Sequence, residues 1–291
     1  MNPNLRLVEA CAQAFLEKFG EDCRHRLPEI ASELGLEIEE VEADSYDGAL
    51  LRLPGAHIGI IVINSRIRSA ARRRFTLCHE LAHYILPNQI DLASPCVADY
   101  IERWRNSESQ VAETEANRFA AEILMPFSHI AEHLAASPSF QAIRSIADAC
   151  AVSLTAAAFR LAEVTSHRVA IVWSRDGKVM WYSSSTEFRR AVLRGALDER
   201  TYAHDVFRGE QVPDRFEQVP ATAWLYETNL REGATILEHS VRLHSYNAAL
   251  SLLKIPDQIE LRTEYEDSQS DDISLDPEEF TLRRTRWPSK R

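Results

Sequence analysis

The sequence predicts an α+β protein, with a mainly helical first part that carries a small sheet and a smaller, β-rich second part. Three patterns lead to this expectation. Apolar residues recur at helical spacing through most of the first 165 residues. Two short apolar runs interrupt that spacing, and after residue 166 apolar residues alternate as in strands. We therefore expect a first domain over residues 1–165, closed by helices at about 137–165, a second over 166–260, and a flexible, charged tail over 261–291.

Two helices are expected to open the chain. Residues 4–20 carry apolar side chains near helical spacing, and residues 27–36 form a shorter helix with Pro28 at its start and Gly35 at its end. The stretch over residues 37–45 is acidic, which argues against a DNA-binding helix after the second one. We therefore interpret the second helix as a packing element.

Two strands are predicted next, over residues 49–53 and 57–63, joined by Pro54-Gly55. The second ends about a dozen residues before the helix that carries the chemistry. Two interpretations of this strand stay open. It borders a cleft and pairs with an extended peptide, with Ile61 and Ile63 as candidate substrate-binding residues, or it is a fully buried strand of the sheet.

The helix predicted around residues 75–86 carries a His-Glu-x-x-His run. His79 and His83 lie four residues apart, so both imidazoles project from one face at a separation that suits one tetrahedral Zn²⁺. Glu80 lies about 100° around the helix, where a carboxylate can accept a proton from a water that the metal activates. Apolar neighbours surround the run, and burying these three polar side chains without a partner would be costly. The sequence therefore predicts a site for one zinc ion with Glu80 as its catalytic residue. A cluster of arginines precedes it, which we read as a solvated face, with an acidic partner as the alternative: Arg66, Arg68, Arg72, Arg73 and Arg74.

A catalytic zinc with two histidines needs a third protein ligand. The helix predicted over residues 111–125 offers Glu113 and Glu115. Glu113 shares a face with Asn117 and with a stripe of alanines that permits close helix packing, whereas Glu115 points to the opposite side. We favour Glu113 as the ligand and keep Glu115 as the alternative. Asn117 would then brace the second nitrogen of a histidine.

Two further segments resemble functional motifs, and we favour a structural interpretation for both. His129 to His133 reads His-x-x-Glu-His, the inverted zinc motif, but its surroundings are polar and no third ligand follows, so a solvent-facing helix is preferred. Residues 139–164 have the rhythm of a helix-turn-helix but few basic residues. We expect these helices to close a bundle over the first domain rather than to bind DNA.

The second part is predicted to contain strands over residues 168–173 and 178–182 about a turn at Asp176-Gly177. A helix is expected over residues 185–197. Further strands are expected over residues 222–226 and 235–243. No catalytic cluster is visible there, so recognition, regulation or dimerisation is its expected role.

Composition limits the classes of partner. The 291 residues carry a net charge of −11, which disfavours broad nucleic-acid binding, and no apolar run approaches the length of a membrane span. The five cysteines are scattered, so a disulfide framework is not expected and a cytoplasmic location is. We expect neither direct nucleic-acid binding nor membrane association, and the sequence leaves the oligomeric state open.

Three segments together resemble the ImmA/IrrE family of metallopeptidases. They are the strand ending at Asn64, the run from Arg72 to His83, and the run from Glu113 through Asn117 to Met125-Pro126. The resemblance covers roughly residues 20–165 and implies a zincin-like, gluzincin-type core. It implies that His79, His83 and Glu113 bind the metal and that Glu80 is the catalytic acid and base.

The resemblance also implies a substrate and a biological role. Family members cleave repressors of the helix-turn-helix type, which releases genes of mobile elements, phages or stress responses. On this basis we expect a separate protein substrate of that kind. The alternatives are a regulator that sequesters a repressor without cleaving it, and a DNA-binding regulator.

Overall fold

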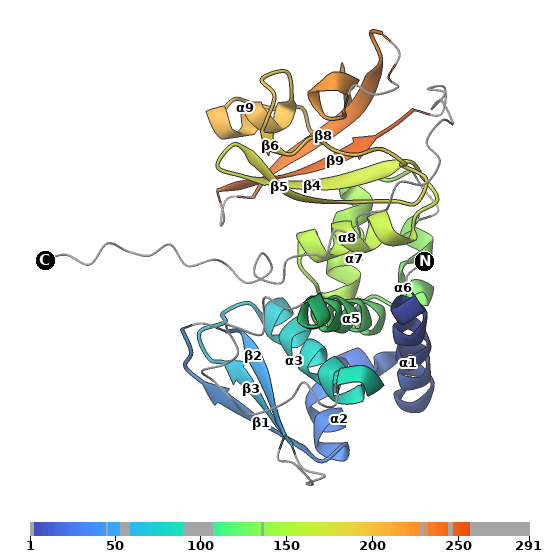
Figure 1. Cartoon of the computed structure of the whole chain (residues 1–291), viewed down its shortest axis with the longest axis vertical. Helices are drawn as coiled ribbons and strands as arrows, with labels where there is room; N and C mark the ends of the chain where they lie inside the picture. The colour runs from blue at the N-terminus through green and yellow to red at the C-terminus, as the bar shows by residue number, and fades with distance from the viewer. Residues whose placement is uncertain are drawn as a thin grey trace, which may run out of the picture. The chain divides into compact units, whose positions relative to one another are not determined.

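The computed structural model describes residues 3–44, 46–52, 59–89, 107–134, 137–226, 230, 232–243 and 247–256. They belong to two compact units, which divide between Pro126 and Phe127. Each unit combines helices with a sheet, which confirms the α+β class (Figure 1). The predicted domain boundary lies further along, at residue 165, because the helices between the two positions group with the second sheet. The tail over 261–291 lies outside the described residues.

Helices of the first unit follow the predicted order. Helix α1 (Pro3–Phe19) packs on helix α5 (Ser107–Leu124) through the edge-to-face contact of Phe15 and Phe119, whose ring centroids lie 5.6 Å apart. Aromatic packing therefore joins α5 to the N-terminal helix. The bounds of the helices in this unit are α1 (Pro3–Phe19), η1 (Glu21–His25), α2 (Leu27–Glu33), α3 (Ala70–Ile85), η2 (Pro87–Gln89) and α5 (Ser107–Leu124).

The sheet of the first unit has three strands, β1 (Leu36–Val41), β2 (Gly48–Arg52) and β3 (Gly59–Asn64), in the order β1-β3-β2. The predicted hairpin is confirmed, since β2 and β3 pair antiparallel; its turn lies outside the described residues. Strand β1, which pairs parallel with β3, was not predicted. Glutamates alternate with and follow its apolar residues Leu36 and Ile38, so the sequence pattern indicated an acidic segment and not a strand.

Strand β3 is the central strand, which decides between the two interpretations of Ile61 and Ile63. Ile61 lies opposite Ile38 on one side and Leu50 on the other, and both isoleucines are buried. Because both of its edges are paired, β3 has no free hydrogen-bonding groups for a peptide. The expectation that Ile61 and Ile63 bind substrate is therefore wrong, and the buried-strand interpretation is correct. Strand β2 lies at the edge instead.

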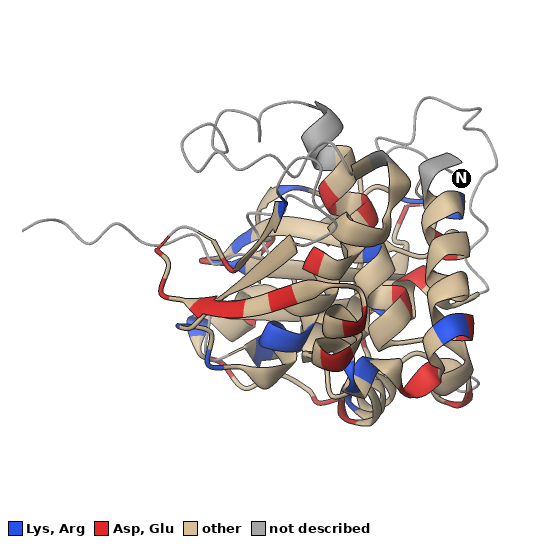
Figure 2. Cartoon of the chain, turned by 90° about the horizontal axis from the view of Figure 1, so that it is seen from below, with Lys and Arg blue, Asp and Glu red and all other residues tan. Residues whose placement is uncertain are grey.

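The arginine cluster has its acidic partners within the chain. Arg66 pairs with Glu42 and Asp44, and Arg73 pairs with Glu40. In Figure 2, acidic positions (red) on a strand lie beside basic positions (blue) on a helix. These pairs connect β1 and the segment after it to α3 and the segment before it.

The second unit is built on a six-stranded antiparallel sheet in the order β6-β5-β4-β9-β8-β7. The predicted hairpin of β4 and β5 and the predicted strand β8 are confirmed. The bounds are α6 (Phe127–Leu134), α7 (Phe140–Cys150), α8 (Leu154–Val164), β4 (Val169–Arg175), β5 (Lys178–Ser184), β6 (Gly195–Ala196), α9 (Tyr202–Arg208), β7 (Glu217–Pro220), η3 (Ala221–Ala223), β8 (Thr235–Leu243) and β9 (Ala248–Lys254).

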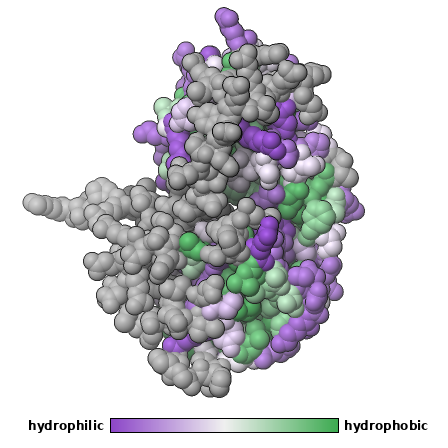
Figure 3. All heavy atoms as spheres, turned by 45° about the vertical axis from the view of Figure 1, so that its right-hand side comes forward, coloured by the Kyte–Doolittle hydropathy of each residue, from purple (hydrophilic) through white to green (hydrophobic). Residues whose placement is uncertain are grey.

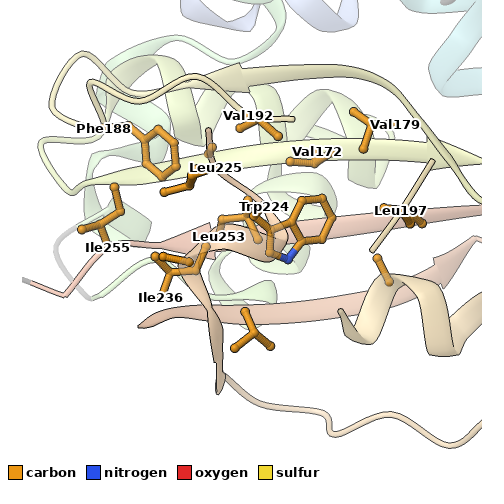
Figure 4. Packing of buried hydrophobic residues seen from close by; sticks show 14 residues of the cluster. Val172, Val179, Phe188, Val192, Leu197, Trp224, Leu225, Ile236, Leu253 and Ile255 are labelled. Atoms are coloured by element: carbon orange, nitrogen blue, oxygen red, sulfur yellow. The ribbon is translucent and has the colours of Figure 1, made fainter. Parts of the chain in front are cut away.

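The two faces of this sheet are covered by different elements. Val172 and Trp173 are successive residues of β4 and point to opposite faces. On the Trp173 face, Trp181 stacks on Trp173 and contacts Phe159 of α8 with ring centroids 4.2 Å apart. On the Val172 face, a buried apolar cluster surrounds Trp224 (Figure 4). The sheet is therefore buried on both sides.

Two predictions for this unit are wrong. Residues 185–197 form turns, an isolated bridge at Val192 and the short strand β6 instead of a helix. Phe188 and Val192 have helical spacing because both fill the core, and Arg189 between them has a φ of 47°, which a helix does not tolerate. Residues 222–226 form η3 and a bridge at Leu225 instead of a regular strand.

Helices α7 and α8 meet at 111° across a short turn, an angle that DNA-binding helix-turn-helix motifs also show. However, α8 is buried from Ala157 to Ala162, and it packs on β4 and β5. As folded it cannot enter a DNA groove. We predicted that this pair closes a bundle over the first domain; the structure places it on the second sheet.

Among the described helices, none is by itself long and apolar enough to cross a membrane. Taken together across their bend, α7 and α8 reach the required length and composition.

Large exposed hydrophobic side chains occur singly on several elements of the described chain. The face in Figure 3 shows hydrophobic side chains distributed among hydrophilic ones. Such exposure is ordinary on protein surfaces, and we assign no binding role to it. The residues are Leu7, Val41, Val111, Phe127 and Tyr226.

Candidate metal centre

Helix α3 presents the His-Glu-x-x-His run in its C-terminal half. The helix begins after Ser69, whose hydroxyl accepts a hydrogen bond from the Arg72 amide, an N-cap that satisfies one free backbone donor. It ends before Pro87, which forces Leu86 into extended backbone. Leu77, Cys78, Leu81 and Ala82 are buried, so this helix is anchored in the core just before and within the motif.

Three metal-binding side chains converge between α3 and α5. His79 Nε2 and His83 Nε2 lie 3.0 Å apart. Glu113 Oε2 lies 3.0 Å from His79 Nε2, and Glu113 Oε1 lies 3.4 Å from His83 Nε2. One ligand atom from each residue falls within 4.8 Å of the others. Two imidazoles and one carboxylate at these separations fit a zinc-type ion that retains one open position.

Both histidines are held from behind by side-chain amides. His79 Nδ1 lies 3.0 Å from Asn117 Oδ1, and His83 Nδ1 lies 2.5 Å from Gln89 Oε1. An amide oxygen can only accept, so each Nδ1 carries a proton, and in the neutral ring each Nε2 presents its lone pair to the cluster. This is the tautomer that metal binding requires. Asn117, predicted as a brace, is thus in hydrogen-bond contact with His79.

Sequence reasoning missed Gln89, whose role depends on contacts with α5. Gln89 is 1% exposed, and its Nε2 donates to the Ala112 carbonyl and to Glu115 Oε2, both at 3.0 Å. These two acceptors orient the amide so that its oxygen faces His83. The arrangement also separates the two candidate ligands: Glu113 enters the metal cluster, and Glu115 holds Gln89. A polar residue soon after the helix-ending proline was the available signal.

Glu80 lies next to the cluster without belonging to it. Its side chain is buried, with 6% of the residue exposed, and it packs against strand β2 at Gly48. Burial raises the pKa of Glu80, and Glu113 also raises it, against the lowering effect of His79 and His83. A buried carboxylate beside two histidines is placed to exchange a proton with a group bound at the cluster.

In the absence of a cation, the charged groups of the cluster shift one another's pKa values. Burial alone would lower the pKa of His83, but the carboxylates of Glu113 and Glu80 raise it to about 9. Burial alone would raise the pKa of Glu113, but His79 and His83 hold it well below its usual range. A proton therefore takes the place that a divalent cation would occupy. The donor set fits such a cation.

The inverted motif does not form a second metal site. His133 Nε2 lies 3.6 Å from the exposed carboxylate of Glu132, its neighbour in sequence. In the part of the chain that the structure describes, neither His129 nor His133 belongs to a group of metal-binding side chains. The segment forms helix α6, as predicted.

A helix that presents two histidines and a glutamate beside a third ligand from a second helix defines a metallopeptidase-type site. Residues 31–162 match the family described as the IrrE N-terminal-like domain, a peptidase family. This region, less than half of the chain, therefore matches the ImmA/IrrE family of metallopeptidases, and a metal ion and a protein substrate are what the family implies.

Two curated relatives agree with this assignment. The chain is 40% identical over 120 residues to the radiation response metalloprotease IrrE of Deinococcus radiodurans. It is 38% identical over 108 residues to the protein of that name from Deinococcus deserti. These matches cover 41% and 37% of this chain but 35% and 37% of the relatives, so the chain spans little more than a third of their length.

A solved structure described as a transcriptional regulator of Mycobacterium tuberculosis is similar in fold. The TM-score is 0.55 at 15% sequence identity, and the match covers 85% of this chain and 87% of the other. At this identity the likeness concerns the fold alone. It extends over most of the chain, beyond the region that the family covers.

Proposed function

We propose that this protein is a zinc-dependent endopeptidase that cleaves a separate protein, a transcriptional repressor of the helix-turn-helix type. The observation that carries the proposal is the cluster of His79, His83 and Glu113 with Glu80 beside it. Amide oxygens hold Nδ1 of both histidines, so Nε2 of each ring faces the cluster and can bind a cation once it is neutral. The donor set of two imidazoles and one carboxylate favours zinc among the common metals.

The chain's own residues divide the work of peptide hydrolysis. His79, His83 and Glu113 would hold a zinc ion, which supplies Lewis-acid polarisation of the scissile carbonyl and a nucleophilic water at neutral pH. Glu80 accepts the proton of the attacking water and delivers it to the leaving amine nitrogen. Gln89 and Asn117 keep both imidazoles in their orientation throughout.

Strand β2 replaces β3 as the strand that binds an extended substrate. Among the described residues, β2 pairs with β3 alone, so its outer edge presents unpaired backbone groups. The same strand lies against Glu80 through Gly48. A substrate segment added to this edge would bring its backbone next to the catalytic carboxylate.

The nature of the substrate rests on the family. A repressor with a basic DNA-binding surface also suits the net charge of −11 of this chain. The described cysteines Cys11, Cys23, Cys78 and Cys150 are not joined in disulfides, which suits the cytoplasm, where such repressors act.

The test is cleavage of a candidate repressor on co-expression with this chain. We expect a defined cut that disappears with EDTA and in Glu80→Gln, where kcat falls by roughly 10²- to 10⁴-fold while metal content is unchanged. The control variant is Glu132→Gln, which alters the exposed glutamate of the inverted motif. We expect this variant to cleave the repressor normally. Full activity of Glu80→Gln would contradict the proposed mechanism.

The non-proteolytic alternative makes a different prediction for the same variant. If the chain acts by sequestering a repressor, Glu80→Gln binds the repressor and derepresses its genes as well as the unaltered chain does. The DNA-binding alternative is disfavoured by the burial of α8.

A further inference from the structure

We infer that Gly48 is a positioning residue for Glu80, because strand β2 approaches helix α3 so closely that a side chain at this position would displace the catalytic carboxylate. The inference rests on the proposed function, since it assigns Gly48 a part in the reaction of Glu80. It concerns a residue that neither binds the metal nor carries a reactive group.

The space around Gly48 is filled by two side chains of α3. A methyl group at Gly48 would lie 2.5 Å from Thr76 Cγ2, 2.8 Å from Glu80 Oε1 and 3.1 Å from Glu80 Cγ. All three distances are shorter than van der Waals contact. The backbone of Gly48 therefore forms the wall against which the Glu80 carboxyl rests. Its nearest atoms belong to none of the three metal ligands.

Contacts on both sides of Gly48 hold β2 against α3. Before it, Asp47 Oδ2 accepts a hydrogen bond of 2.6 Å from Arg72 Nε. After it, Arg52 donates to the Tyr84 carbonyl at 2.6 Å, and its guanidinium lies 4.2 Å from the centre of the Tyr84 ring. These partners lie at four-residue spacing along α3 with Thr76 and Glu80 between them, so they share one face.

Because β2 is fastened on both sides, it cannot retreat to make room at position 48. The Asp47 carbonyl also accepts a hydrogen bond from the Asn64 amide at 2.8 Å, which ties the same point to the end of β3. An added methyl group would therefore be accommodated by movement of Thr76 and Glu80. Glu80 would leave its place beside the cluster while His79, His83 and Glu113 stay.

One variant isolates the contact with Glu80 from the contact with Thr76. Gly48→Ala alone meets both side chains. In Gly48→Ala/Thr76→Ser the Cγ2 atom is gone, so the clash with Glu80 remains as the main one. Gly59→Ala is the matched control in the partner strand, since its methyl would lie 2.7 Å from Leu36 Cδ2 and 3.2 Å from the Leu51 carbonyl, away from Glu80.

The first measurement needs no substrate. Thermal unfolding of the full chain in EDTA is recorded for Gly48→Ala/Thr76→Ser and Thr76→Ser, each with Glu80 present and with Glu80→Ala. Overpacking should lower the midpoint by about 4 °C or more, and Glu80→Ala should remove more than half of that loss. Gly59→Ala should lose the same amount in both backgrounds. Equal losses for Gly48→Ala/Thr76→Ser in both backgrounds would overturn the inference.

The second measurement is hydrolysis of denatured casein by the zinc-loaded chain. We expect kcat of Gly48→Ala/Thr76→Ser to fall by about 100-fold, with KM and zinc content close to those of Thr76→Ser, and kcat of Gly59→Ala to be unchanged. An unchanged kcat in Gly48→Ala/Thr76→Ser would overturn the inference. Casein left intact by the unaltered chain would count against the proposed proteolysis, while the unfolding comparison would still decide the role of Gly48.

Discussion

Each unit of the molecule buries a carboxylate, and the two differ in what surrounds them. Glu238 on β8 is 0% exposed and accepts hydrogen bonds of 2.7 Å from Trp224 Nε1, Ser240 Oγ and the Ala203 amide. Glu113 on α5 is 8% exposed, and its oxygens face the Nε2 atoms of His79 and His83. Glu238 thus meets three donors, whereas Glu113 meets two imidazole nitrogens that share a proton with it in the absence of a cation.

The difference separates a structural buried charge from a functional one. Donors complete the environment of Glu238, which ties β8 to the beginning of α9 and to the Trp224 core shown in Figure 4. The two imidazole nitrogens that face Glu113 can instead exchange their proton for a cation. Burial of an acidic residue is therefore a weak sign of function by itself. Whether the residue has a functional role depends on the groups that face it and on their protonation.

The largest effect should come from exchanging each carboxylate for its amide. Glu113→Gln should weaken zinc binding by more than the roughly 10- to 100-fold that loss of an outer brace costs, because it removes a ligand. Glu238→Gln should bind zinc normally, yet lower the free energy of unfolding by about 2 kcal/mol, because its amide protons face donors. Zinc titration and denaturant unfolding of both variants check this pair, and normal zinc binding by Glu113→Gln would break the comparison.

A smaller effect is expected from the brace that sequence reasoning missed. Gln89→Leu removes the acceptor behind His83, so zinc affinity should fall by roughly 10- to 100-fold. Gln218→Leu, which alters an exposed glutamine of β7, is the control and should leave zinc affinity as it is. Competition with a chromogenic chelator measures both. Unaltered affinity in Gln89→Leu would show that His83 is oriented without its amide partner.

The smallest expected effect is on the pH dependence of stability. The contribution of His83 falls as pH rises, whereas the contribution of bound zinc grows. Without metal, the raised pKa of His83, about 9 against an ordinary 6.5, adds stability that is complete below pH 6.5 and is lost as pH rises through 9. The lowered pKa of Glu113 adds stability that is present above pH 4.5 and is lost as pH falls below it. Zinc requires neutral His83, so its own contribution grows as pH rises.

Thermal unfolding between pH 6 and 9 should therefore show a falling midpoint in EDTA and a widening gap to the zinc-loaded chain. In Glu113→Gln the fall in EDTA should be reduced, because the carboxylate that raises the pKa of His83 is gone. A midpoint in EDTA that stays level from pH 6.5 to 9 would show that His83 and Glu113 do not share a proton.

Local patterns in the sequence predicted the centre of the site. Helical spacing put His79 and His83 on one face and Glu80 beside them, and the side of α5 that carries Ala116 and Ala120 indicated Glu113 over Glu115. These inferences succeed because ligand pairs four residues apart depend on helix geometry alone. The roles of Gln89 and Gly48 depend on how close α5 and β2 come to α3, and spacing within one segment does not show that distance.

Errors in the sheets have the same origin. Strand β3 was read as a possible edge because β1, its parallel partner on the other side, is an acidic segment that sequence alone does not pair. In the second unit, β9 is the buried strand between β4 and β8, but its Ala- and Leu-rich run lacks the β-branched residues that identify strands. Trp224 was placed in a strand, whereas its indole is fixed by Glu238 on β8.

Zinc K-edge X-ray absorption of the zinc-loaded chain tests the metal centre most directly. We predict one zinc per chain with nitrogen and oxygen neighbours at about 2.0–2.1 Å, the scattering pattern of two imidazoles, and no sulfur near 2.3 Å. In Glu113→Gln this zinc should be lost on dialysis. A sulfur neighbour, or the same spectrum and stoichiometry in Glu113→Gln, would contradict a site made of His79, His83 and Glu113.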